Sequence, residues 1–451
     1  MTNLSEQWQR SDVRAAQGAQ AWNVRLLFGF LVACLLAQVT MTFGPPLGLR
    51  TILRTLPFLG SLSMLLLVRG SSRRHPAKPW AVAVLLITGL MLLSPTNGGT
   101  VAAVAQAGFS AAIVAPLFWT TRIELSSNRL ASLFTIWWTF HALSAGIGVL
   151  QFYWPETFAF SPSEQLSHFG LDYVASLSFE RADGVSVLRP MGLTDLPGGA
   201  SVSALYVIVG SCYWFLRPGR LLVRFGVLVL TTMATFTLLI CQVRSIQIAT
   251  LGGLLFLAGL LVWRGRGGLA RRLVFLLGGI IVVAVGWALA QAGPTVASRL
   301  ATLTSEPPGE LYYRNRGFFL TETVTDFLPN NPLGAGLGRW GMMNQYFADE
   351  AGAPAIHAEV QWTGWAIDGG VPLILLYLCL LVVAELSLVR EARGSSGEAM
   401  ILLGVLAALG AALCALTLNA PVMSSQLALE FWMFNGLAVG QAARSDSSDG
   451  P

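Results

Sequence analysis

Residues 221–263 read LLVRFGVLVLTTMATFTLLICQVRSIQIATLGGLLFLAGLLVW. Two long apolar runs, 221–241 and 245–263, are joined here by the short polar sequence QVRSIQ. A helix of about 20 mostly apolar residues crosses the hydrocarbon core of a bilayer, and it satisfies its backbone polar groups internally. The stretch therefore predicts a hairpin of two membrane-spanning helices, with Arg244 at the membrane boundary between them.

The same pattern recurs along the whole chain. Of its 451 residues, 54% are hydrophobic and 11% are charged, and the mean hydropathy is +0.63. These values lie outside the usual range of soluble globular proteins. We therefore predict an all-α, polytopic integral membrane protein with about twelve transmembrane helices. The twelve segments are 26–43, 51–68, 80–94, 100–120, 129–152, 199–216, 221–241, 245–263, 273–291, 359–388, 399–418 and 424–440. The third segment is short, so its helix could be tilted or partly re-entrant.

The short loops set the orientation, because lysine and arginine collect on the cytoplasmic side of a membrane protein. With a cytoplasmic N-terminus, the cytoplasmic segments hold 19 of the 28 basic residues, including the loops SSRRHPAKP, RPGRLLVR and RGRGGLARR. An even number of spans returns the C-terminus to the same side. The first apolar run has no small-residue cleavage site after it, so we expect it to stay as a helix.

This topology divides the chain into alternating membrane and loop regions. A cytoplasmic tail, 1–25, precedes helices one to five, 26–152. Two long outer loops and two further groups of helices follow. They are the first outer loop at 153–198, helices six to nine at 199–291, the second outer loop at 292–358, helices ten to twelve at 359–440 and a cytoplasmic tail at 441–451.

Charge and cysteine content exclude several other classes of protein. The net charge of +5 follows from the basic cytoplasmic loops, so it gives no support for nucleic-acid binding. All five cysteines lie in or beside apolar spans, which indicates small hydrophobic side chains and not a disulfide or metal framework. No outer carboxylates have an Asp-x-Asp-like spacing, so we expect no metal and no cofactor.

The polar sequence concentrates in the two long outer loops. Loops of this length in a compact membrane domain are usually functional or disordered, and their aromatic, glycine and proline residues indicate order. The spacing of apolar residues at 317–328 predicts a short amphipathic helix, and Pro329 to Gly338 must then turn. Glu430, inside the last span, should face the interior of the bundle.

Nine basic residues face outward on this topology, and all are arginines. Arginine stays charged and pairs bidentately with phosphate oxygens, as an enzyme needs when it neutralises a lipid pyrophosphate leaving group without a metal. The alternative is that they cap helices or anchor at lipid headgroups. Those beside the mouths of spans are Arg189, Arg244 and Arg316, and the others are Arg50, Arg54, Arg181, Arg299, Arg314 and Arg339.

His357 lies where the second outer loop enters the tenth span. A histidine can take a proton from a hydroxyl near neutral pH, or can hold that hydroxyl by a hydrogen bond. A hydrogen-bonded interfacial histidine without a catalytic role is the alternative. The functional hypothesis therefore depends on His357 together with the arginines.

In these segments the sequence resembles the bacterial O-antigen ligase and O-antigen polymerase superfamily. These are integral membrane glycosyltransferases that use undecaprenyl-diphosphate-linked glycans. The resemblance covers most of the chain in layout and about 180–370 in motif. It is carried by RPMGL at Arg189, VRS at Arg244, IHAEV at His357, and RGFFLTETVTDFLPNNPLGAGLG, where Arg316 precedes a short helix and the turn of Pro332, Leu333, Gly334, Gly336 and Gly338.

The sequence also departs from the family pattern. The family histidine is commonly followed by asparagine, and Ala358 stands here, whereas Glu359 fits the acidic residue that often comes next. Asp368 and Gly369 are displaced slightly from the usual spacing further along the span. His357 is thus the better match to the family than Asp368.

The resemblance implies a GT-C-like layout and a metal-independent transfer. Arg244, Arg316 and His357 would be the catalytic residues, and Arg189, Arg314, Arg181 and Glu359 would bind the donor pyrophosphate and glycan. The implied partners are the undecaprenyl-diphosphate-linked donor, a sugar acceptor on a lipid core or on a lipid-linked repeat unit, and membrane lipids. The implied location is the bacterial inner membrane, with the active site on the extracytoplasmic side.

Two other functions remain open at this stage. A polymerase of the same superfamily would add the growing chain to the next repeat unit, and Arg181 and Gly192 have a spacing once noted in polymerases. A polysaccharide-lipid transporter or flippase would instead place charged or broken helices at the midplane and would have internal repeats. We see no convincing repeat in the sequence.

Overall fold

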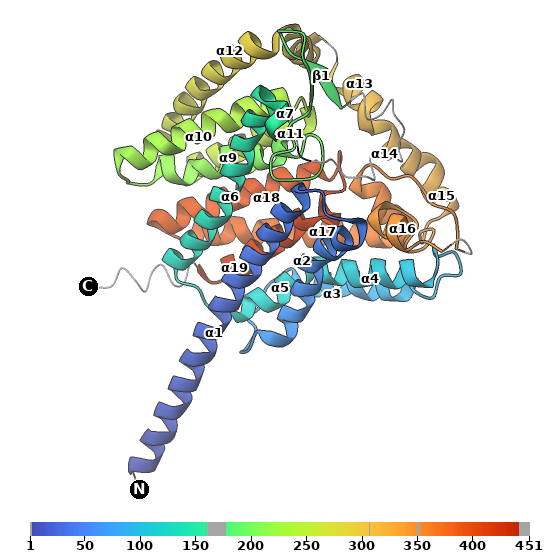
Figure 1. The fold of residues 1–451 in the computed structure, drawn as a ribbon. Helices are drawn as coiled ribbons and strands as arrows, with labels where there is room; N and C mark the ends of the chain where they lie inside the picture. Colours follow the sequence, from blue (N-terminus) through green and yellow to red (C-terminus); the bar gives the residue numbers. More distant parts are fainter. Residues whose placement is uncertain (1, 159, 161–176, 306, 350–351, 442–451) are drawn as a thin grey trace.

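The structure is a computed structural model that describes residues 2–158, 160, 177–305, 307–349 and 352–441. Figure 1 shows a bundle of helices with a single small β-hairpin. Most predicted spans form long helices, as the apolar runs require. The long helices are α1 (Thr2–Thr42), α2 (Leu47–Leu67), α6 (Ser127–Tyr153), α10 (Leu221–Ile240), α11 (Arg244–Trp263), α12 (Gly267–Ser305), α17 (Gln361–Gly394) and α18 (Gly397–Leu416).

Within the described part of the chain, nine helical segments are long and apolar enough to cross a membrane. Eight of them belong to the helices just named, with α1 contributing Gln17–Thr42 and α12 contributing Gly267–Pro294. The ninth, Thr100–Arg122, combines α4 (Thr100–Val114), α5 (Pro116–Trp119) and the 3-10 turn η1 (Thr120–Arg122). The protein is therefore a multi-pass helical membrane protein, as its composition predicted.

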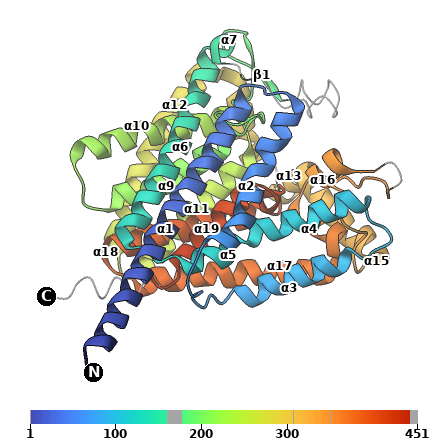
Figure 2. The same ribbon diagram turned by 60° about the horizontal axis from the view of Figure 1, so that its bottom comes forward.

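Three further helices are shorter. These are α3 (Lys78–Met91), α9 (Ala200–Leu216) and α19 (Gln426–Ala438), and they fall on the third, sixth and twelfth predicted spans. Each predicted span thus contains helix, while the number twelve stays a prediction. Figure 2 shows α3 and α4 beside α17, and α3 packs along α17.

The outer surface of the bundle is apolar where a bilayer would contact it. Exposed side chains on α10, α11 and α12 include Phe225, Leu255 and Phe275, of which Phe275 is 80% exposed. The core extends through the bundle, and its large buried aromatic side chains include Trp137 of α6, Tyr206 of α9 and Trp432 of α19. Nearly every side chain of α9 is buried, which is typical of a helix that is apolar on all faces.

Hydrogen bonds identify the segments that share one end of the bundle. Gly98 N donates to Leu337 O (2.9 Å), Ala353 N to Asn97 O (3.1 Å) and Gln361 N to Thr417 O (3.1 Å). Arg54 pairs with Asp195, and the Cys241 thiol contacts Pro190 O. These contacts involve residues of both long loops. We therefore call this end of the bundle the long-segment end. Its described residues are the connections 43–46, 92–99, 154–158, 160, 177–199, 241–243, 307–349, 352–360 and 417–425.

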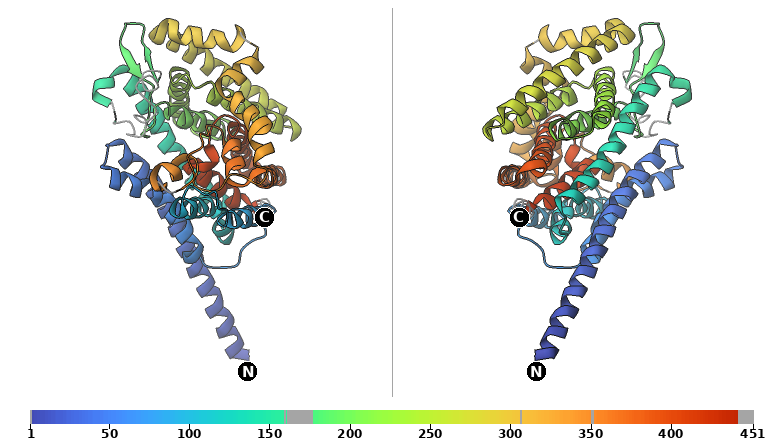
Figure 3. Two further views of the ribbon diagram at one scale, coloured as in Figure 1. Left: turned by 90° about the vertical axis from the view of Figure 1, so that its right-hand side faces the viewer. Right: turned by 90° about the vertical axis from the view of Figure 1, so that its left-hand side faces the viewer.

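The opposite, short-loop end carries most of the basic residues. Arg264 donates to Ser395 O (3.0 Å), and Arg217 pairs with Glu398 at 3.6 Å. Arg122 donates to Leu65 O and Val68 O. The N-terminal half of α1 extends from this end beyond the other helices (Figure 3). The grouping of basic residues predicted from the short loops is therefore found at one end of the molecule.

The long-segment end contains more regular structure than the sequence indicated. Strands β1 (Ser178–Glu180) and β2 (Ser186–Leu188) pair antiparallel, and α12 continues past a kink at Gly293 and Pro294. Residues 159 and 161–176 of the first long loop lie outside the described residues, as do 306 and 350–351 of the second and most of the C-terminal tail, 442–451. The remaining short elements are α7 (Pro155–Phe158), α16 (Gly341–Phe347) and the 3-10 turn η5 (Val422–Ser424).

Candidate functional site

Residues 308–330 form a helical arm at the long-segment end, drawn in orange on the right of Figure 1. The arm is longer than the predicted helix at 317–328, and it contains two π-helical turns. Such turns add a residue to the helix repeat and are frequent at functional sites. Its elements are α13 (Pro308–Tyr312), η3 (Tyr313–Gly317), α14 (Phe318–Glu322), η4 (Thr323–Phe327) and α15 (Leu328–Asn330).

Two side-chain contacts fix the arm against the bundle. The Tyr312 hydroxyl donates to Leu418 O at 3.0 Å, and the hydroxyls of Thr323 and Thr363 lie 2.7 Å apart. One contact lies at the outer end of α18 and the other at the start of α17. The turn η3, which carries Arg314 and Arg316, is held between them.

The glycine-rich turn after the arm docks on a break in α17. Ala335 N donates to Ile367 O (2.8 Å), and Val371 N donates to Pro332 O (2.9 Å). A Cβ on Gly370 would lie 2.1 Å from Pro332 O, and the backbone of Gly334 has a φ of +94°. Glycine is needed at both positions because neither the space nor the backbone conformation admits a side chain.

The side chain of Asp368 holds this turn in place by hydrogen bonds within the bundle. Its carboxylate accepts hydrogen bonds from Trp340 Nε1 (2.9 Å) and Gln106 Nε2 (3.1 Å). Trp340 packs over Gly364, where a Cβ would lie 2.2 Å from its ring. Asp368 is buried, and its two hydrogen bonds give it a role in packing the turn against α17.

Arg339 connects the turn to the segment that carries His357. Its guanidinium donates to Ala335 O and Pro354 O, both at 3.0 Å. Its own carbonyl accepts a hydrogen bond from Ile356 N at 2.7 Å. The residue before His357 is therefore held by the backbone and side chain of one arginine, a contact that the sequence did not reveal.

Arg316, His357 and Glu359 form a side-chain cluster at this end. Arg316 forms an ion pair with Glu359, and His357 Nε2 lies 3.0 Å from Glu359 Oε1. The ring of Phe319 lies 5.5 Å from that of His357. The His357 side chain is 57% exposed, so a substrate can reach it. Three predicted site residues from two separate segments are thus brought together.

The cluster has an arrangement suited to proton transfer. A carboxylate accepts a hydrogen bond from the Nε2–H tautomer of histidine and so stabilises it. In that tautomer the Nδ1 lone pair of His357 remains available to a hydroxyl. A site of acid–base transfer is expected to contain a histidine base and a carboxylate that orients it, with an arginine beside both.

Arg189 and Val243, the residue before Arg244, both lie beside Gly198 at a second position of the long-segment end. Gly198 N donates to Arg189 O (3.3 Å). A Cβ on Gly198 would lie 3.3 Å from the side chain of Val243 and 4.0 Å from Arg189 Cδ. Arg244 is the first residue of α11, where the helix dipole disfavours a cation. The helix dipole therefore does not account for an arginine at this position.

The other predicted binding residues differ in their surroundings. Arg314 lies exposed on η3. Arg181 donates to Phe152 O (2.9 Å) and pairs with Asp183. The hydrogen bond from Arg181 lowers the pKa of Asp183 to about 2 and raises that of Arg181 itself. These contacts hold the β-hairpin on the end of α6 and give Arg181 a structural role.

Comparisons with known proteins add no family assignment. No protein-family model matches the chain, and no curated protein matches it. Among the described residues, no group of three or more His, Cys, Asp or Glu side chains could hold a metal ion. The function must therefore be argued from the site itself.

Proposed function

We propose that the protein is a membrane glycosyltransferase that moves an undecaprenyl-diphosphate-linked glycan onto a sugar hydroxyl, as an O-antigen ligase does. The observation that carries the proposal is the cluster of Arg316, His357 and Glu359. It lies at the same end of the bundle as Arg189 and Arg244. The family resemblance of these segments supports the same conclusion.

In the proposed reaction, His357 accepts the proton of the acceptor hydroxyl as that oxygen attacks the anomeric carbon of the donor. The bond between the anomeric carbon and the diphosphate oxygen breaks, and the diphosphate leaves with the lipid. Arg316, Arg189, Arg244 and Arg314 neutralise its developing charge. His357 then passes the proton to the diphosphate or to water, and Glu359 keeps the ring oriented throughout.

The proposal includes a location and a topology. The chain would lie in the bacterial inner membrane with both termini in the cytoplasm, since the short-loop end holds the basic loops. The long-segment end would face the extracytoplasmic compartment, where the proposed transfer takes place. The partners would be the lipid-linked donor, the sugar acceptor and membrane lipids.

The direct test is transfer in vitro from a purified undecaprenyl-diphosphate glycan. Replacing Arg316 or His357 by alanine should lower the rate by a factor on the order of 10²–10³, as for loss of one transition-state contact. Arg129→Ala, an exposed arginine at the short-loop end, is the matched control. Wild-type rates in Arg316→Ala, Arg244→Ala and His357→Ala would exclude this site.

The acceptor separates the two enzymatic alternatives. A ligase transfers to lipid core alone, and a polymerase of the same superfamily transfers to lipid-linked repeat units alone. Supplying one acceptor at a time therefore identifies which reaction occurs.

Two observations favour a transporter or flippase as the second candidate. The helix α17 is broken at Gly369 and Gly370, and Glu430 is buried beside His141 within the helices. Broken helices and intramembrane ionisable groups are both features of transporters. Movement of the donor lipid between leaflets without glycan transfer would support this candidate.

A further inference from the structure

A cavity of about 320 Å³ lies inside the long-segment end, apart from the cluster of Arg316, His357 and Glu359. Binding sites for small molecules usually begin at about 300 Å³ and combine apolar walls with a few placed polar groups. Its apolar walls come mainly from α1 and α2, and its polar walls from α6, α9, α19 and the loop 189–199. The apolar side chains include Met41, Leu53, Pro57, Phe58, Leu196 and Leu427.

Two pairs of ionisable side chains face this cavity. Arg54 lies 2.5 Å from Asp195, and His141 Nε2 lies 3.8 Å from Glu430 Oε2. All four residues line the cavity. The side chains of Asp195, His141 and Glu430 are almost completely buried. Buried ion pairs stabilise a fold little or not at all compared with apolar side chains, and intramembrane ionisable groups usually mark a binding site or pathway.

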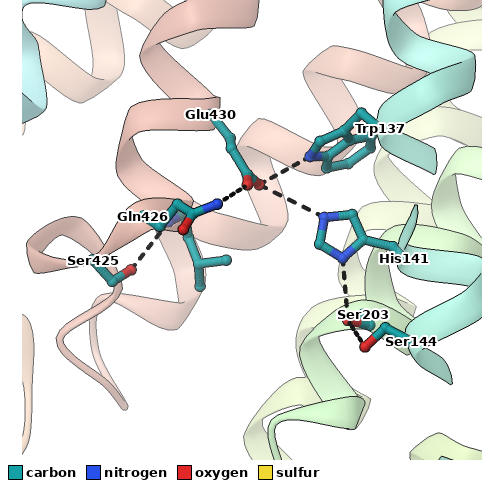
Figure 4. A network of polar contacts seen from close by, with 8 residues as sticks. Trp137, His141, Ser144, Ser203, Ser425, Gln426 and Glu430 are labelled. Atoms are coloured by element: carbon teal, nitrogen blue, oxygen red, sulfur yellow. Dashed lines mark hydrogen bonds and ion pairs between the residues drawn. The ribbon is translucent and has the colours of Figure 1, made fainter. Parts of the chain in front are cut away.

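Figure 4 shows how the second pair is held in place. Glu430 accepts hydrogen bonds from Trp137 Nε1 (2.9 Å) and Gln426 Nε2 (3.2 Å). His141 Nδ1 lies 3.1 Å from the hydroxyl of Ser203. The carboxylate and the imidazole are therefore fixed at their positions before any ligand arrives, which lowers the entropic cost of binding.

The charge balance of the cavity selects among ligand classes. An anionic phosphate would be repelled by Glu430, and the charge of Arg54 is already balanced by Asp195. A purely apolar lipid chain would add no hydrogen bond to the polar groups that line the cavity, among them Glu430 and Gln426. A neutral ring with several hydroxyls satisfies both donors and acceptors, and its C–H face can lie on Phe58 and Pro57.

We propose that this cavity binds a sugar ring. Glu430, Asp195, Gln426 and Ser203 would accept from or donate to the ring hydroxyls, and Phe58 would contact its apolar face. The inference deepens the proposed function because it names a glycan subsite for the same reaction. The sugar could belong to the donor or to the acceptor, since both carry neutral hydroxyl-bearing rings.

The loop 189–199 connects this cavity with the arginines at the outer face. Asp195 extends from the loop to Arg54 in the cavity wall, while Arg189 lies beside Gly198 on the same loop. Gln151 holds the loop by accepting from Met191 N and Gly192 N, both at 2.8 Å. A sugar in the cavity therefore lies next to the position where Arg189 would bind a diphosphate.

The test is sugar binding without transfer, on the full chain in lipid nanodiscs. Saturation-transfer NMR with methyl β-D-glucopyranoside and methyl 2-acetamido-2-deoxy-β-D-glucopyranoside should show contact with the wild type for at least one probe. Glu430→Gln and Asp195→Asn should raise its Kd by about tenfold or more, as for loss of a charged hydrogen-bond acceptor. Glu124→Gln changes an exposed carboxylate at the short-loop end and should leave the Kd unchanged.

A further variant, which removes no charge, tests the proposal independently of whether the charge variants fold. Leu196 lines the cavity but is 49% exposed, so Leu196→Trp can fill the cavity without disturbing the core or removing a charge. It should abolish binding of the probe. Equal binding by Leu196→Trp and wild type, or displacement of the sugar by inorganic pyrophosphate, would overturn the proposal.

Competition identifies the source of the sugar. Displacement by a short-chain isoprenyl diphosphate sugar, weakened by Arg189→Ala, assigns the cavity to the donor. Displacement by a free oligosaccharide, unaffected by Arg189→Ala, assigns it to the acceptor. Failure of the proposed function is distinguishable, because Arg316→Ala should lower the rate of transfer while retaining sugar binding. An inactive wild type that binds sugar would leave the cavity assignment intact.

Discussion

At the short-loop end, Arg73 donates to the carbonyls of Thr121, Ile123 and Val439 and so joins three segments. At the long-segment end, Arg316 instead pairs with Glu359 beside an exposed histidine. The residue type is the same, but the first arginine completes the hydrogen bonds of loops while the second belongs to a group of reactive side chains.

This difference indicates which measurement each residue should change. Backbone carbonyls left without donors destabilise the folded state, so substitutions at the short-loop end should lower stability. The exposed cluster contributes little to packing, so substitutions there should lower activity and leave stability unchanged. Three predictions examine this division.

The largest expected effect on stability is that of Arg73→Ala. The substitution removes three donors from partly buried carbonyls, so we expect a loss of about 3 kcal/mol in the free energy of unfolding. Denaturant titration of the purified protein in detergent measures this quantity. Arg74→Ala is the matched control, because the neighbouring Arg74 is exposed. An unfolding midpoint for Arg73→Ala equal to that of Arg74→Ala would contradict the stabilising role of Arg73 at the short-loop end.

The second prediction concerns pH and His75 in the same region. Its Nε2 lies 2.9 Å from Asn435 Oδ1, and its Nδ1 accepts from Ala77 N. Burial lowers the pKa of His75 from the usual 6.5 to about 4. The unfolded chain therefore takes up a proton as pH falls through 6.5, whereas the folded chain does so only near 4.

His75 therefore makes its full contribution to the free energy of unfolding above pH 6.5. This contribution decreases by about 3 kcal/mol in total as the pH falls toward 4. Unfolding temperatures measured between pH 8 and pH 4 should fall more steeply for the wild type than for His75→Gln, which carries no titratable group. Parallel curves for the two proteins would show that His75 does not contribute to this pH dependence.

The sequence predicted the membrane helices well because hydrophobic length is a local property. It also selected Arg316, His357 and Glu359, which the structure brings together, although the chemistry of the cluster stays a prediction. The arginines themselves gave no sign of their different surroundings. Arg181 and Arg316 look alike in sequence, and only the contacts of Arg181 with Phe152 and Asp183 separate them.

The rest depends on contacts between residues distant in sequence. Gln106 and Asp368 are 262 residues apart along the chain, and no periodicity connects them. The strands of the β-hairpin have three residues each, too few for an alternation to be recognised. His141 lies in the middle of an apolar helix, so the sequence drew attention to Glu430 without indicating its partner.

Arg339 shows where the division between the two ends is incomplete. It lies at the long-segment end, yet it donates to backbone carbonyls as Arg73 does. The carbonyls it joins belong to the glycine-rich turn and to the segment before His357. We therefore expect Arg339 to act as a positioning residue, with an effect on His357 and a smaller effect on stability.

The substitution Arg339→Lys examines this expectation with the smallest predicted effect. Lysine keeps the charge but lacks the planar fork that reaches two carbonyls at once, so the kcat of the proposed transfer should fall about tenfold, or about 1.4 kcal/mol, with little change in KM. Arg129→Lys serves as the control. The rate at which diethyl pyrocarbonate modifies His357, followed by mass spectrometry, should change as well, and it reports on the histidine whether or not transfer is observed. Lower stability with an unchanged modification rate would place Arg339 beside Arg73 as a purely structural arginine, and the two ends would then differ only in the cluster of Arg316, His357 and Glu359.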